Sequence, residues 1–120
     1  METIWSKKID AILSIGRPLK DIGVRNWALN KECALAALDQ LSVVGIAVLG
    51  GDVYLVHDQT VQSNYDNWYC QRENGESYTA FVARSIMYSR AYISNYNISS
   101  APVLFAIVPD AYSAETPDQV

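Results

Sequence analysis

The strongest nucleophiles and bases in this chain are two cysteines and a single histidine. A cysteine nucleophile needs a base within reach, and no local arrangement of the sequence brings His57 to Cys33 or Cys70. Two cysteines and one histidine at these spacings also match no common zinc-ligand pattern. We therefore predict a protein without catalytic residues, metal or cofactor. A small enzyme that uses Cys70 or His57 stays as an alternative.

Carboxylates gather in the middle of the chain, where residues 41–76 hold five acidic side chains against Arg72 alone. Their spacing is not that of a calcium loop, and no phosphate-binding glycine pattern is present. Aromatic side chains are interleaved with these carboxylates. Such a surface suits a basic protein partner, because charge steers the encounter and buried rings supply affinity. The members of this acidic-aromatic segment are Asp52, Tyr54, Asp58, Tyr65, Asp66, Trp68, Tyr69, Glu73 and Glu76.

Each member of the segment also has a simpler interpretation. The carboxylates can be solvated turn residues, and the rings can be core. For Trp68 we favour the core, since large aromatic side chains are mostly buried.

The composition limits the classes of partner. The chain has 120 residues, of which 50% are apolar, and this fits one compact domain. A net charge of −4 has the wrong sign for coating nucleic acid or anionic lipid, so neither is expected as a partner. The longest apolar runs, residues 41–51 and 101–109, are too short to span a bilayer, and charges interrupt the first fifteen residues. We expect a cytoplasmic protein with reduced thiols.

The spacing of apolar residues predicts three helices. The first is capped by Thr3 and ends at residues 16–18, and the second is capped by Asn30 and closed by Gly45. The third and longest is capped by Ser77. These helices supply the apolar stripes that must cover a sheet.

The remaining apolar segments predict strands. Residues 46–56 are rich in β-formers, and the Gly50-Gly51 pair within them marks either a tight turn or a bulge. Residues 60–72 are expected to return as one or two strands, and residues 101–108 form a short buried strand.

Together these elements predict a single α+β domain over residues 1–109, a small sheet covered by about three helices. Its long helix presents Val82, Ile86 and Ile93 on one apolar stripe. Residues 110–120 are rich in acidic residues, proline and serine, and are expected to form a flexible tail.

Several segments also carry a family resemblance. Residues 45–54 read GIAVLGGDVY, residues 65–70 read YDNWYC, and residues 75–77 open the long helix with GES. In this order and spacing the segments resemble the immunity protein 40 family of bacterial polymorphic toxin systems. The resemblance extends back through residues 24–29 and covers most of the chain. The family motif positions that map here are Asp52, Tyr54, Asp66, Asn67, Trp68 and Tyr69.

The resemblance implies a function. Members of this family look like small cytosolic antidotes that bind the C-terminal domain of a toxin and block it, without a cofactor or catalysis. Many such toxins attack nucleic acid through a basic cleft, which the acidic segment would suit. A general protein-interaction module without a toxin is the other alternative.

Overall fold

The computed structural model describes residues 2–98 and 101–111, and within them the predicted α+β class is confirmed. Most of the predicted tail, residues 112–120, lies outside the described residues. In chain order the elements are α1 (Lys7–Leu13), β1 (Arg17–Pro18), the 3-10 helix η1 (Lys20–Ile22), β2 (Trp27–Ala28), α2 (Lys31–Val43), β3 (Val48–His57), β4 (Thr60–Tyr69), α3 (Tyr78–Asn95) and β5 (Val103–Pro109).

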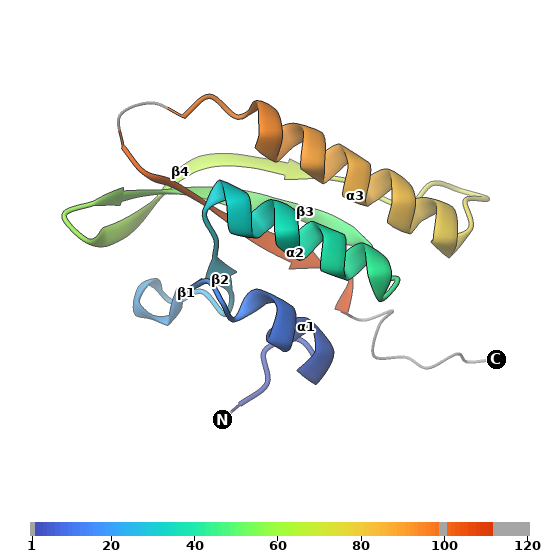
Figure 1. Cartoon of the computed structure of the whole chain (residues 1–120), viewed down its shortest axis with the longest axis horizontal. Helices are drawn as coiled ribbons and strands as arrows, with labels where there is room; N and C mark the ends of the chain where they lie inside the picture. The colour runs from blue at the N-terminus through green and yellow to red at the C-terminus, as the bar shows by residue number, and fades with distance from the viewer. Residues whose placement is uncertain (1, 99–100, 112–120) are drawn as a thin grey trace.

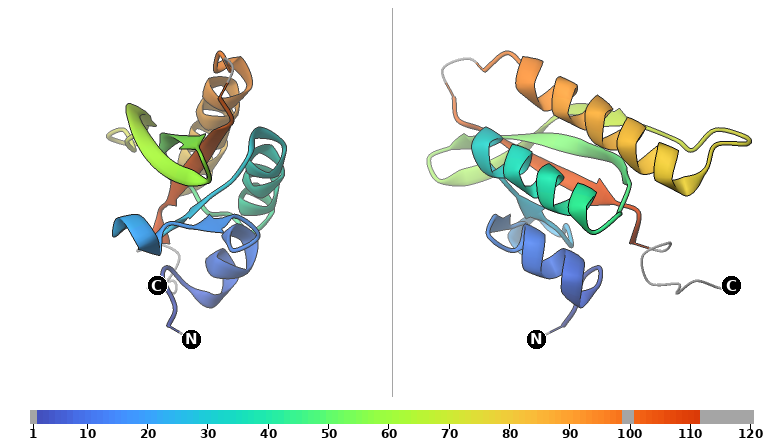
Figure 2. Two further views of the ribbon diagram at one scale, coloured as in Figure 1. Left: turned by 90° about the vertical axis from the view of Figure 1, so that its left-hand side faces the viewer. Right: turned by 45° about the vertical axis from the view of Figure 1, so that its right-hand side comes forward.

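The centre of the fold is a three-stranded sheet in the order β4-β3-β5, in which β3 is antiparallel to both neighbours. Helices α2 and α3 lie side by side on one face of this sheet (Figure 1). Helix α1 packs against α2, and the short β1–β2 pair lies on the other side of the sheet (Figure 2). Because β4 comes first in the strand order and, among the described strands, pairs only with β3, it forms one edge of the sheet.

The two edge strands of the sheet differ in whether other segments of the chain hydrogen-bond to them. Beside β5, the backbone of Leu29 exchanges two hydrogen bonds with Phe105 at 2.8 and 2.7 Å. The Asn26 side chain donates to the Ile107 carbonyl on the same edge at 2.9 Å. The β5 edge is thus covered by the chain itself, whereas β4 pairs only with β3 among the described strands.

Local capping explains where the helices begin. The side chains of Asn30 and Ser77 accept the backbone N–H groups of Cys33 and Ala80 at the starts of α2 and α3, as predicted. Gly45 follows α2 with φ of 74°, as its predicted place after the helix end requires. Helix α1 is present, but its predicted cap at Thr3 was wrong. Its cap is Ser6, because the backbone N–H groups nearer Thr3 turn to the Asp10 carboxylate instead.

The main core lies between the sheet and the helices. It buries Ile9, Leu38, Phe81, Ile93 and Phe105 almost completely, so that all three helices contribute to one cluster. A smaller cluster on the opposite face of the sheet joins β1–β2 to β3, β4 and β5 through Leu19, Ala28, Tyr54, Val61 and Ala106.

The Gly50-Gly51 pair forms part of an irregular strand and not a turn. The register of β3 against β5 shifts between Val48 and Gly50. A Cβ atom on Gly51 would lie 2.3 Å from the Trp68 ring and 2.6 Å from the Ala106 carbonyl oxygen. Glycine is therefore needed at position 51, because the Trp68 ring lies directly over the backbone of β3.

Candidate protein-binding site

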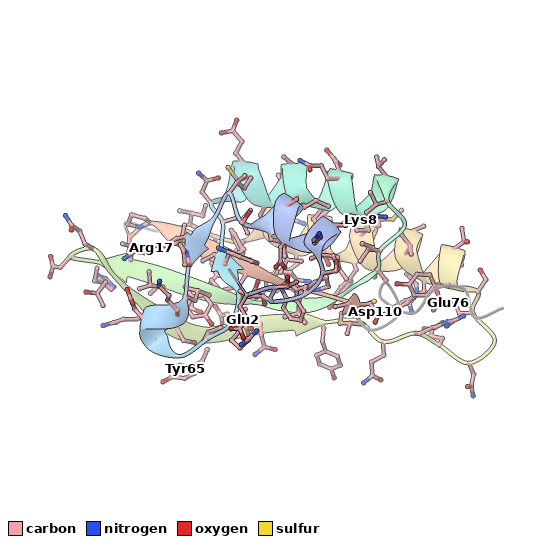
Figure 3. The ribbon with its side chains drawn as sticks, turned by 90° about the horizontal axis from the view of Figure 1, so that it is seen from below. Glu2, Lys8, Arg17, Tyr65, Glu76 and Asp110 are labelled. Atoms are coloured by element: carbon pink, nitrogen blue, oxygen red, sulfur yellow. The ribbon has the colours of Figure 1, made fainter. Side chains whose placement is uncertain are left out.

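Strand β4 contains a bulge. Asn67 pairs with Asp52 and Ser63 with Tyr54, so β4 uses two more residues than β3 between these pairs. Tyr65 in this bulge has φ of 68° and its side chain is 86% exposed. Figure 3 shows it projecting outward from the molecule. A bulge at an open strand edge discourages indiscriminate pairing with other strands and directs side chains to a new position.

The bulge is fastened to the end of α3. The Tyr96 hydroxyl donates to Oδ2 of Asp66 at 2.5 Å and accepts from Nδ2 of Asn64 at 2.7 Å. Within the bulge, the backbone N–H of Asp66 donates to Oδ1 of Asn64 at 2.9 Å. Burial raises the pKa of Tyr96, and its hydrogen bond to Asp66 raises it further. These bonds hold Asp66 in one position beside the helix.

Two of the predicted binding rings are buried. Tyr54, which was predicted as a ring of the binding surface, is only 5% exposed, because β1–β2 covers the face of β3 from which it projects. Trp68 is only 4% exposed, which confirms the prediction that it belongs to the core. It stacks on Tyr92 with ring centroids 4.7 Å apart and donates from Nε1 to Ser89 Oγ at 2.9 Å. Both rings, Tyr54 and Trp68, are therefore part of the packing beneath the surface and are not available to contact a partner.

Other predicted residues are exposed along β4. Tyr69 is 70% exposed at the end of the strand, and Asn67 is exposed between it and the bulge. Asn67 lies opposite Asp52 in the ladder, so the two share the sheet face that points away from α2 and α3. Burial raises the pKa of the Asp52 carboxyl above its usual value.

The acidic residues do not form one continuous patch. Asp58 lies in the β3–β4 turn and Glu73 in the loop after β4. The ten residues of β4 separate them by roughly 30 Å at the usual rise per strand residue. Two carboxylates of the same acidic segment thus lie at opposite ends of a long hairpin.

Arg84 of α3 neutralises the last carboxylate of the segment. Its guanidinium donates to both carboxylate oxygens of Glu76 at 2.7 and 2.8 Å and to the Gln71 carbonyl at 2.7 Å. These hydrogen bonds lower the pKa of Glu76 to about 2. Arg84 also donates to the Cys70 sulfur at 3.2 Å. Glu76 therefore organises the loop and carries no uncompensated charge, which the sequence did not reveal.

Two hollows lie between the β4 side of the sheet and α3. The first, which we call the tyrosine hollow, has a volume of about 520 Å³ and is lined by Asp66, Tyr88, Ala91, Tyr92, Asn95, Tyr96 and Asn97. The second, the loop hollow, has about 590 Å³ and is lined by Tyr69, Cys70, Gln71, Arg72, Glu73, Asn74, Arg84 and Tyr88. Tyr88 borders both.

Sequence reasoning missed the contribution of α3 to this surface. A signal was present, because Tyr88, Tyr92 and Tyr96 recur at intervals of four and so share one face of the helix. In the structure this row of tyrosines faces the bulge of β4.

The groups considered for catalysis do not converge. His57 pairs with Thr60 at the turn end of the hairpin, whereas Cys70 follows the other end of β4. Cys33 lies at the start of α2, and both thiols are free. Across residues 2–98 and 101–111, no three His, Cys, Asp or Glu side chains gather to hold a metal ion. None of the helices that the structure describes is both long and apolar enough to cross a membrane.

The described residues form a small α+β domain with an open strand edge, exposed tyrosines and a carboxylate held between strand and helix, and such features suit a protein-binding surface. The comparison with protein families agrees. The model of the family described as Immunity protein 40 matches residues 18–109, and the chain belongs to this family. It is thus an immunity protein, a class that protects against a toxin. Neither the curated proteins nor the solved structures gave a match.

Proposed function

We propose that this chain is the stoichiometric, non-catalytic inhibitor of a cognate toxin domain in the cytoplasm, and that the toxin docks on the surface formed by β4 and α3. The observation that supports this location is the pair of exposed rings on an open strand edge, Tyr65 at 86% and Tyr69 at 70%. Exposed aromatic side chains on a rigid scaffold are typical anchors of protein interfaces.

The charge of this surface favours a basic toxin. Asp66 and Glu73 lie beside the exposed rings, and the described residues form no ion pair with either. A basic cleft, such as that of a nuclease, would meet these carboxylates and be covered by the rings. Carboxylates at the rim of an interface act mainly on the association rate, and buried rings act mainly on the dissociation rate.

The test needs the cognate toxin domain, which we expect to be encoded in the reading frame next to that of this chain. We expect a one-to-one complex in calorimetry, and cells that produce the toxin should survive only when this chain is also produced. A toxin that forms no complex with the folded chain, or that kills despite saturating amounts of it, refutes the function.

Surface variants locate the interface. Tyr69→Ala is expected to speed dissociation by about 10-fold or more, as truncation of an interface anchor does. Glu73→Lys should slow association and weaken its dependence on salt. Asp58→Lys has the same charge change at the far end of the hairpin and serves as the control. If Tyr69→Ala and Glu73→Lys both bind like the unmodified chain, the toxin docks elsewhere.

A further inference from the structure

The tyrosine hollow has walls that are already fixed in place. Tyr92 stacks on the buried Trp68 ring at an interplanar angle of 27°. Tyr96 packs edge-on against Phe105 with centroids 5.6 Å apart, and its hydroxyl is bonded to Asp66. The Tyr92 and Tyr96 rings are themselves 5.9 Å apart. Because packing and hydrogen bonds hold both rings, a ligand that enters the hollow orders little of the protein.

Asp66 supplies a negative charge at this hollow. In the described residues, both side-chain hydrogen bonds donated to its carboxylate, from Tyr96 and Asn64, go to Oδ2. Oδ1 therefore remains available as an acceptor. No lysine or arginine that the structure describes forms an ion pair with Asp66. Burial raises the pKa of Tyr92, and the charge of Asp66 raises it further, so the field of this carboxylate reaches the ring.

A hollow with a carboxylate and several tyrosine rings suits a cation. The faces of aromatic rings attract cations electrostatically, and the attraction is stronger where water is displaced. The hollow also includes the amides of Asn95 and Asn97, whose carbonyl oxygens are acceptors. A planar guanidinium stacks on rings and carries five N–H donors in a fixed arrangement, so it matches these walls better than a compact ammonium.

Building on the proposed function, we propose that the tyrosine hollow receives an arginine side chain of the toxin domain. The guanidinium lies against Tyr88 and Tyr92 and donates to Asp66. This contact places one positive residue of the toxin at the junction of the β4 bulge and α3. It thereby sets the orientation of the toxin relative to the exposed rings of β4.

The first experiment needs no toxin. N-acetyl-arginine amide is titrated into the isotope-labelled chain, with N-acetyl-citrulline amide as the neutral analogue of the same shape. We expect arginine amide to shift the NMR signals of Tyr88, Tyr92 and Asn95 in a saturable manner, and citrulline amide to leave them unchanged. Equal shifts with both compounds, or none with arginine amide, overturn the proposal.

The second experiment uses the complex of this chain with the cognate toxin domain. Asp66→Asn keeps an oxygen for the Tyr96 hydroxyl but removes the charge, and it is expected to weaken binding by roughly 10-fold or more at low salt. Tyr88→Ala should weaken it by about 3- to 10-fold. Asp21→Asn, in η1 on the other side of the sheet, removes the same charge and should have no effect.

The outcomes separate the two proposals. Failure of the unmodified chain to bind the toxin refutes the proposed function, whatever the arginine amide does. Formation of the complex with unchanged affinity for Asp66→Asn and Tyr88→Ala keeps the function and overturns the arginine site. Circular dichroism of each variant shows that the fold is intact.

Discussion

The indole N–H of Trp68 donates one hydrogen bond in the described structure, to the Ser89 hydroxyl oxygen at 2.9 Å. Ser89 is fully buried. In Ser89→Ala this buried N–H loses its acceptor. A buried donor left without a partner costs about 1 to 3 kcal/mol. We therefore expect the free energy of unfolding to fall by about 2 kcal/mol, measured by denaturant titration with an unchanged m value.

Two controls isolate the hydrogen bond. Ser94→Ala changes an exposed serine in the same helix and should alter stability by less than about 0.5 kcal/mol. In a Trp68→Phe background there is no N–H to satisfy, so Ser89→Ala should cost much less there. A coupling of about 0.5 to 3 kcal/mol between positions 68 and 89 is expected. An equal cost of Ser89→Ala in both backgrounds would refute the reasoning.

Three further predictions concern the core, the sheet and the loop clamp. Ile86→Ala removes a 5%-exposed side chain and should cost about 2 to 4 kcal/mol, whereas Met87→Ala, which is 69% exposed, should cost little in the same titration. Gly51→Ala would press a methyl group against a buried indole ring and a carbonyl, and a clear drop in melting temperature is expected. Glu76 has a folded-state pKa of about 2, below its ordinary 4.5, because Arg84 donates to it. Its stabilisation is therefore complete above about pH 4.5 and lost towards pH 2, so the stability difference between the chain and Glu76→Gln should shrink over that range.

The sequence by itself determined most of the local structure. Asn30 and Ser77 mark the helix starts because their side chains satisfy backbone N–H groups within three residues. The apolar stripe through Ile86 and Ile93 is buried as its spacing predicts. The caps depend on contacts between residues close in the chain, and the stripe depends on the 3.6-residue period of the helix, so both can be predicted from the order of residues alone.

Which side chains are available to a partner was decided only by the tertiary structure. Tyr54 and Tyr69 lie on the same β-hairpin, yet one is covered by β1–β2 and the other is exposed. The negative charge of Glu76 is paired with Arg84 of the following helix. Asp66 became part of a hollow because Tyr96 reaches it from 30 residues away. Exposure and charge compensation depend on which distant segments fold over a residue, and a linear pattern of residue types does not contain that information.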